Sequence, residues 1–195
     1  MNPQINLVES KLRDYASLIL KWNKIINLIS KNTEAELWER HILDSAQLFD
    51  YLTPDDHICD LGSGAGFPGI VLSIMGIKHI TLIESDTRKC AFLNQASLIS
   101  QNKLTIINER IENCFITQTS PVNIVTSRAL TSLDNLLHYN KIFTPTKSFL
   151  LLKGKNFQKE LDEAQENWHF VHQVFPSSTN SESVILRIEN VEQKN

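Results

Sequence analysis

The 195 residues include 42% hydrophobic and 21% charged side chains, a composition typical of one soluble globular domain. No stretch approaches the ~18 consecutive apolar residues of a membrane span, and the first residues lack an apolar signal core, so we expect a cytoplasmic protein without a membrane partner. The net charge of −3 argues against a general nucleic-acid binder. The three widely spaced cysteines indicate neither a disulfide framework nor a zinc site.

Two amphipathic helices are predicted at the start of the chain. Apolar residues recur every three or four positions over residues 4–29, which is the period of a helix with one buried face. A second helix is predicted from Thr33, an N-cap with Glu36 as the partner of a capping box, to Leu52. We expect residues 1–53 to form an N-terminal helical cap on a domain of residues 54–195, the two together making one compact unit.

From His57 onward, short apolar runs alternate with helical patterns, which favours an α/β fold with a largely parallel sheet. Strands are expected at residues 57–61, 79–84, 104–108, 122–127, 148–152, 170–175 and 183–189, and helices at 68–76, 87–101, 132–143 and 156–167. The link of residues 176–181 suits an antiparallel hairpin, because a parallel crossover needs about a dozen residues or more.

A strand that runs into a glycine-rich turn and a helix is predicted at Ile58-Cys59-Asp60-Leu61-Gly62-Ser63-Gly64-Ala65-Gly66-Phe67-Pro68-Gly69. Alternating glycines let a ligand approach the backbone, and N–H groups at a helix start favour an anionic group. Gly64-x-Gly66-x-x-Gly69 also matches the dinucleotide fingerprint, with Glu84 placed for a ribose hydroxyl. The carboxylate of Asp60 is expected to face the same crevice from the end of the strand, where it favours an ammonium or sulfonium over a pyrophosphate.

Asp60-x-Gly62-x-Gly64-x-Gly66 resembles the first motif of the S-adenosylmethionine-dependent methyltransferases. A nicotinamide-dependent oxidoreductase and a structural turn without a ligand are the alternatives that the motif leaves open. No metal is expected, because His169 and His172 would lie on opposite faces of a strand.

Polar residues at the carboxyl ends of strands are further site candidates, because open α/β sheets bind ligands there. Glu84 can accept hydrogen bonds from both ribose hydroxyls. The stretch Arg110-Ile111-Glu112 follows the third strand, where it could bracket an adenine. Arg128 ends the fourth strand at the place for a carboxylate or a phosphate.

Further motifs run through nearly the whole chain: Trp22-Asn23-Lys24, Asn27-Leu28-Ile29-Ser30, Arg40-His41-Ile42-Leu43-Asp44-Ser45, the glycine turn with its Pro68-Gly69 ending, Ser127-Arg128-Ala129 and Leu152-Lys153-Gly154. In this order they resemble the ribosomal RNA small subunit methyltransferase G family, also called glucose-inhibited division protein B. The resemblance implies a Rossmann-like class I S-adenosylmethionine-dependent methyltransferase fold, with a seven-stranded, mostly parallel sheet and an N-terminal helical cap.

The resemblance also implies that S-adenosylmethionine donates a methyl group to N7 of a guanine in 16S ribosomal RNA. Its partner would be that RNA or the small ribosomal subunit, with no obligate protein partner indicated, and a small-molecule methyltransferase is the alternative. No catalytic base is predicted, because N7 has a free lone pair and no proton. The cofactor contacts carried over from the family are Gly62, Phe67, Ile111, Glu112 and Arg128, and physical grounds add Asp60, Gly64 and Glu84.

Two surfaces are predicted to support this reaction. An RNA-binding patch is expected from cations near the strand ends, namely Arg128, Lys153 and Lys155, supplemented by Arg88 and Lys89. Since the protein is net acidic, we expect this patch to meet a structured RNA whose target base leaves its stack.

Arg40, His41 and Asp44 are spaced to share one face of the second predicted helix. We expect that face to support the cofactor pocket rather than to take part in the chemistry. The alternative is a solvated ion pair between Arg40 and Asp44, which would contribute only ~0.3–0.5 kcal/mol.

Overall fold

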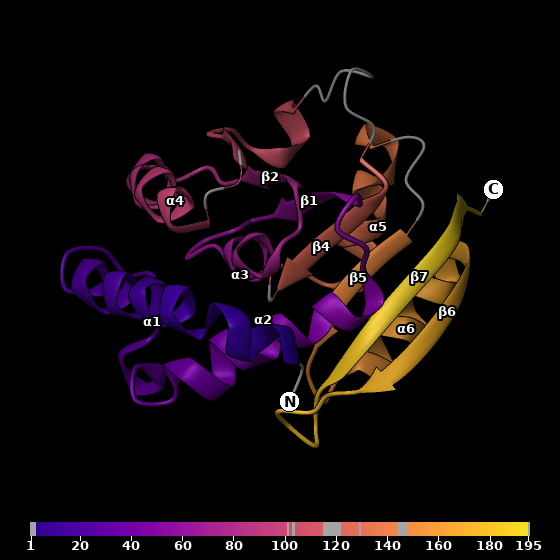
Figure 1. Cartoon of the computed structure of the whole chain (residues 1–195). Helices are drawn as coiled ribbons and strands as arrows, with labels where there is room; N and C mark the ends of the chain where they lie inside the picture. The colour runs from indigo at the N-terminus through magenta and orange to yellow at the C-terminus, as the bar shows by residue number, and fades with distance from the viewer. Residues whose placement is uncertain are drawn as a thin grey trace.

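The computed structural model describes residues 3–100, 102, 104–114, 122–128, 130–143 and 148–194, which form one seven-stranded sheet with helices on both faces (Figure 1). The strands are β1 (His57–Leu61), β2 (His79–Ile83), β3 (Leu104–Ile107), β4 (Ile124–Arg128), β5 (Ser148–Lys153), β6 (Trp168–Pro176) and β7 (Val184–Gln193). Their order across the sheet is β3-β2-β1-β4-β5-β7-β6.

The pairing directions confirm the predicted parallel sheet with a terminal hairpin. Strands β1 to β5 pair in parallel, whereas β7 pairs antiparallel with both β5 and β6. The carboxyl ends of β1, β2 and β4 therefore lie along the same edge of the sheet. Gln101, at the end of the helix predicted over 87–101, and Ala129 lie outside the described residues.

Two layers of helices cover the sheet (Figure 1). Helices α1 (Pro3–Asn23), α3 (Gly69–Met75) and α4 (Thr87–Ser100) pack together on one face, and α5 (Leu133–His138) and α6 (Phe157–Asn167) pack together in the second layer. In the first layer, Leu12, Tyr15 and Ile19 of α1 share a core with Ile70 of α3 and Phe92 of α4. Helix α1 therefore packs into the same hydrophobic core as α3 and α4.

Helix α1 is shorter than predicted. It ends at Asn23 rather than near residue 29. The side chain of Asn23 explains the early end, because its Oδ1 accepts hydrogen bonds from the backbone N–H of Leu28 (2.8 Å) and Ile29 (3.0 Å). These two bonds stabilise a turn that leaves the helix axis.

The second predicted helix is wrong as a single element. The structure has instead the short segments η1 (Lys31–Thr33), η2 (Trp38–Leu43), α2 (Asp44–Ala46) and η3 (Gln47–Tyr51), of which η2 is a π-helix. Thr33 does not cap a helix, because its Oγ1 donates to Ser30 O at 2.9 Å. The Glu36 carboxylate pairs with Arg40 at 3.3 Å rather than completing a capping box.

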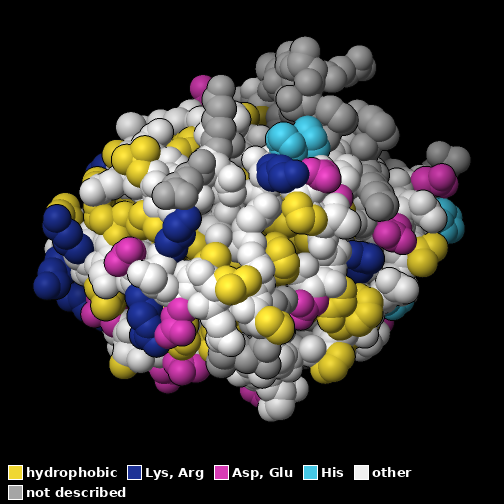
Figure 2. Space-filling view, viewed as in Figure 1, with side chains coloured by type: hydrophobic (Ala, Val, Ile, Leu, Met, Phe, Trp, Pro, Cys, Tyr) yellow, Lys and Arg dark blue, Asp and Glu magenta, His cyan; other side chains and the backbone are white. Residues whose placement is uncertain are grey.

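The surface carries charges of both signs. Figure 2 shows Lys and Arg side chains gathered toward the α1 end of one face, with Asp and Glu side chains among them. This face is therefore a mixture of charges rather than a continuous basic surface. Among the described residues, no helix is both long enough and apolar enough to span a bilayer.

Candidate functional site

The turn between β1 and α3 has the backbone that its glycines predict. Gly62, Gly64 and Gly66 have φ values of 64°, 57° and 87°, which residues with a side chain rarely adopt. The N–H of Gly64 donates to Glu84 Oε2 at 2.9 Å, and the N–H of Asp86 donates to Glu84 Oε1 at 2.9 Å. Two backbone bonds therefore hold this carboxylate just beyond the end of β2.

A cavity of about 290 Å³, which we call the turn cavity, lies beside this turn. Six of the predicted cofactor contacts line it, namely Gly62, Gly64, Glu84, Ile111, Glu112 and Arg128. They come from the ends of three parallel strands and from the short helix η4 (Ile111–Asn113). The structure thus brings together residues that are up to 66 positions apart in the sequence.

Two further residues of the turn cavity were not identified from the sequence. Tyr139 donates its hydroxyl hydrogen to Glu112 Oε1 at 2.7 Å, and burial together with this bond raises the pKa of Tyr139 to about 12. Leu130 covers the glycine turn, since a Cβ at Gly62 would lie 2.5 Å from Leu130 Cδ1. Neither residue belongs to a motif, so no sequence signal could have pointed to it.

Asp60 requires a correction, because its carboxylate does not face the ligand crevice. The residue has 0% exposure. Its Oδ2 accepts from the N–H of Gly69 at 3.2 Å, and its Oδ1 lies 3.4 Å from the Thr126 hydroxyl. Burial raises the pKa of Asp60 to about 8. Its contacts therefore stabilise the start of α3 beneath the turn.

Phe67 also lies behind the turn cavity rather than among its lining residues. Its ring is 5.7 Å from the ring of Tyr15 and is stacked on His41 at 5.2 Å. The guanidinium carbon of Arg128 lies 5.7 Å from the centre of the Phe67 ring. The aromatic ring of Phe67 therefore packs against the Arg128 guanidinium on the protein interior side. Phe67 does not line the turn cavity, so the structure does not place it as a direct cofactor contact.

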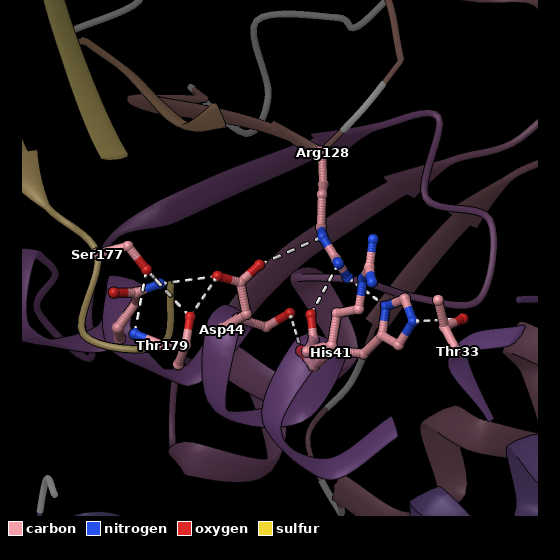
Figure 3. Close-up of polar contacts among 9 residues, drawn as sticks. Thr33, His41, Asp44, Arg128, Ser177 and Thr179 are labelled. Atoms are coloured by element: carbon pink, nitrogen blue, oxygen red, sulfur yellow. Dashed lines mark hydrogen bonds and ion pairs between the residues drawn. The ribbon is translucent and has the colours of Figure 1, made fainter. Parts of the chain in front are cut away.

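Arg128, at the end of β4, is held by three contacts with the segment of η2 and α2 (Figure 3). Its Nη1 lies 2.6 Å from His41 Nδ1, its Nη2 donates to Arg40 O at 2.8 Å, and its Nε lies 3.4 Å from Asp44 Oδ2. All three nitrogens of the guanidinium therefore have a partner on one helical segment. This arrangement supports the expectation that Arg40, His41 and Asp44 stabilise the pocket.

His41 is neutral in this arrangement. Because arginine can only donate hydrogen bonds, His41 Nδ1 must accept one from Arg128, and Nε2 then carries the hydrogen toward Thr33 Oγ1 at 3.1 Å. Burial, together with the charges of Arg128 and Arg40, lowers the pKa of His41 to about 4. The imidazole therefore serves as an acceptor for Arg128 near neutral pH.

Asp44 links Arg128 to the turn between β6 and β7 (Figure 3). Its Oδ1 accepts hydrogen bonds from Thr179 Oγ1 and Gln47 Nε2, both at 2.9 Å. Burial raises the pKa of Asp44, and the charge of Arg128 opposes this rise. The Arg40 side chain pairs with Glu36. The alternative of a surface ion pair between Arg40 and Asp44 is therefore not what forms.

A second and larger cavity, which we call the outer cleft, has a volume of about 750 Å³ and also includes Arg128. Lys153 lies in its wall, but only 8% of its side chain is exposed. Its Nζ donates to Glu160 Oε2 at 2.7 Å and to Thr131 O at 3.3 Å. The expectation of a free phosphate-binding cation at Lys153 is thereby corrected, because a carboxylate neutralises it.

The other predicted RNA contacts lie apart from the outer cleft wall. Lys155 is exposed in the turn after β5. The side chain of Arg88, at the start of α4, is 75% exposed and lies 3.6 Å from Asp86. Lys89, also in α4, lines the turn cavity instead. All three remain predictions as RNA contacts.

The residues of the turn cavity fit the groups of S-adenosylmethionine. Each oxygen of Glu84 accepts one backbone hydrogen bond, which leaves lone pairs for the ribose hydroxyls. Arg128 has five N–H donors and uses three in the contacts above, so two are left for a carboxylate. The glycine turn lets a ligand approach its backbone closely.

Comparison with known proteins identifies a methyltransferase family that this chain matches along most of its length. The family described as rRNA small subunit methyltransferase G matches residues 8–186. The ribosomal RNA small subunit methyltransferase G of Rickettsia prowazekii (strain Madrid E) is 47% identical over 192 residues, which is 98% of each chain. The protein of the same name from Orientia tsutsugamushi (strain Ikeda) is 48% identical over 181 residues, or 92% of this chain and 89% of the relative.

Solved structures show the same fold at low identity. A tRNA methyltransferase from Aquifex aeolicus superimposes with a TM-score of 0.60 at 12% identity, covering 78% of this chain and 69% of the other. A mutant of MtNAS in complex with S-adenosylmethionine gives a TM-score of 0.60 at 11% identity, covering 95% of this chain and 74% of the other. The fold is thus the Rossmann-like fold of class I methyltransferases.

The glycine motif by itself left a nicotinamide enzyme open as an alternative. The family match over nearly the whole chain decides between the two, and the turn cavity has groups suited to the sulfonium cofactor. The chain therefore belongs to the rRNA small subunit methyltransferase G family, and it is an S-adenosylmethionine-dependent methyltransferase.

Proposed function

We propose that this enzyme methylates N7 of a guanine in the 16S RNA of the small ribosomal subunit, in the cytoplasm. The single observation that carries the proposal is that the turn cavity and the outer cleft share Arg128. A donor in the first cavity and an acceptor in the second would meet at that residue. The names of the relatives support ribosomal RNA as the class of acceptor.

The described residues suit an acceptor that needs no deprotonation. When bound, the cofactor supplies a methyl group on a sulfonium, and the lone pair of N7 forms the new C–N bond while the S–C electron pair returns to sulfur. Because N7 has no proton to lose, no general base is needed. Alignment of the two reactants can contribute ~7–11 kcal/mol of barrier reduction. Arg128, held by three partners, would orient the cofactor at the boundary of the two cavities.

The acceptor is proposed to be structured RNA rather than a free nucleotide. A protein with a net charge of −3 has little general attraction for phosphates, so shape and local contacts must select the target. Two exposed cations, Lys155 next to the cleft residue Gly154 and Arg88 at the start of α4, would contact phosphates of the nucleotides that flank the target base. A base that leaves its stack could then enter the outer cleft.

The test is to offer methyl-labelled S-adenosylmethionine with naked 16S RNA, assembled small subunits lacking the modification, and free guanine nucleotides. We expect label in 16S RNA, at N7 of one guanine when the position is mapped. Comparing naked RNA with subunits identifies the form that is recognised. Label only on free nucleotides or another small molecule would contradict the RNA acceptor while leaving the methyltransferase assignment intact.

A further inference from the structure

The outer cleft is acidic, which is unexpected beside a polyanionic acceptor. Its ionisable lining residues are five carboxylates and three cations: Glu36, Glu39, Asp44, Glu160 and Glu182, against Arg40, Arg128 and Lys153. All three cations are already paired with carboxylates of the same cleft: Arg40 with Glu36, Arg128 with Asp44 and Lys153 with Glu160. Phosphate groups would be repelled by this charge. A neutral base that offers hydrogen-bond donors would instead be attracted.

Glu160 is the carboxylate of the cleft that is best positioned to accept from such a base. It lies on α6, and its Oε2 accepts from Lys153 Nζ at 2.7 Å and from the N–H of Leu133 at 2.9 Å. These two bonds hold the side chain, which is still 25% exposed. Both use Oε2, so Oε1 has acceptor capacity for a ligand.

The other carboxylates of the cleft are less suited to read a base. Asp44 directs Oδ1 to Gln47 and Thr179 and Oδ2 to Arg128, so both oxygens are engaged. The carboxylates of Glu36, Glu39 and Glu182 belong to exposed residues, where water competes for hydrogen bonds. A partly buried and anchored acceptor loses less on binding, because it is already ordered.

We propose that Glu160 determines base specificity by accepting hydrogen bonds from the N1–H and N2–H groups of the acceptor guanine. This inference rests on the proposed function. Guanine carries these donors on its Watson–Crick edge, away from N7, so N7 can face Arg128 and the turn cavity while the other edge meets Glu160. Adenine has an acceptor at N1 and would place it against a carboxylate. Flipped bases are commonly read on this edge.

The experiment compares wild type with Glu160→Gln on reconstituted small subunits whose mapped target position is guanosine, inosine or adenosine. For guanosine we expect Glu160→Gln to lower kcat/KM about 10- to 100-fold, the range for losing a hydrogen bond to a charged group. Inosine lacks the N2 amino group, so wild type should lose activity on it and Glu160→Gln should lose less. A glutamine can also donate to adenine N1, so the preference for guanosine over adenosine should narrow at least about tenfold.

Glu163→Gln is the matched control. Glu163 lies on the same helix, its side chain is 53% exposed, and it pairs with Lys159 at 3.5 Å. It should retain wild-type rates and base preference. Binding of S-adenosylhomocysteine, measured by calorimetry, should stay within about twofold in both variants, because Glu160 does not line the turn cavity.

Removing the Glu160 charge leaves Lys153 without its carboxylate, which could prevent folding. The double variant Lys153→Met with Glu160→Gln removes both charges and should fold, with the same narrowed base preference. If Glu160→Gln or the double variant binds S-adenosylhomocysteine but keeps the wild-type base preference, the role of Glu160 is overturned while the proposed function stands. Absence of label from all RNA with wild type would overturn both this inference and the proposed function.

Discussion

The turn cavity and the outer cleft meet at Arg128 but are built in different ways. The turn cavity depends on backbone: positive-φ glycines, N–H groups and the ends of adjacent parallel strands. The outer cleft depends on side chains from the η2 segment, α6 and the β6–β7 turn. A motif can specify the first because its residues are close in sequence or at predictable strand ends. The second exists only once distant segments pack together.

Arg128→Gln should impair the turn cavity and the outer cleft together, because Arg128 lines both. We expect the largest effect here, a loss of methyl transfer of at least about 100-fold, with weaker binding of S-adenosylhomocysteine by roughly 1.5–3 kcal/mol. The contacts to His41, Arg40 O and Asp44 are also lost or weakened, so the melting temperature should fall. Calorimetry, transfer assays and thermal unfolding measure the three effects. Arg88→Gln, at an exposed arginine, should leave cofactor affinity unchanged.

Glu84→Gln should affect the turn cavity and leave the outer cleft unchanged, because Glu84 lines only the first of the two. The two Glu84 oxygens accept from the N–H groups of Gly64 and Asp86. A glutamine has only one oxygen, and its NH₂ group can only donate, so one of the two backbone N–H groups loses its acceptor. We expect S-adenosylhomocysteine to bind about 1–3 kcal/mol more weakly, with the KM for the RNA acceptor unchanged. Glu166→Gln, at an exposed position of α6, is the control. Normal cofactor affinity in Glu84→Gln would remove Glu84 from the site.

Asp60→Asn tests whether Asp60 supports the turn cavity from below rather than lining it. The folded pKa of about 8 lies above the usual value of 3.8, so between these values the folded state holds a proton that the unfolded state has released. The contribution of Asp60 to stability therefore falls as pH rises from about 4 to 8. In wild type the unfolding free energy should fall between pH 5 and pH 8. In Asp60→Asn that fall should be smaller by at least about 1 kcal/mol, because the asparagine does not titrate.

Cofactor binding provides the second measurement on Asp60. Because the carboxylate is fully buried beneath the turn, Asp60→Asn should bind S-adenosylhomocysteine within about twofold of wild type. A tenfold loss in a folded variant would contradict the supporting role and return Asp60 to the ligand site. Denaturant titrations at the two pH values would show whether the variant is folded.

Arg40→Ala should have the smallest effect. Arg40 contacts Arg128 through its backbone carbonyl, which the substitution keeps, while its side chain forms an exposed pair with Glu36. The loss in unfolding free energy should be under ~0.5 kcal/mol, and cofactor affinity should not change. Asp44→Asn is the contrasting variant, since it weakens the contact to Arg128 Nε and should reduce cofactor affinity. Equal effects of the two substitutions would contradict this division of roles.

The sequence by itself determined the sheet, the glycine turn and most of the turn cavity. Glycines at positive φ and apolar strand runs have local physical causes, and parallel strands bring their ends to one edge whatever the side chains nearby. Glu84, Ile111 and Arg128 could be placed beside the glycine turn for that reason. The helical spacing of Arg40, His41 and Asp44 also indicated one supporting face.

Only the tertiary structure decided the partners of the charged groups. Asp60 and Lys153 sit at strand ends as expected, yet one is buried against the start of α3 and the other pairs with Glu160. Tyr139 and Leu130 enter the turn cavity without any motif. The physical reason is that burial and pairing depend on which distant side chains pack nearby, and periodicity along the chain does not contain that information.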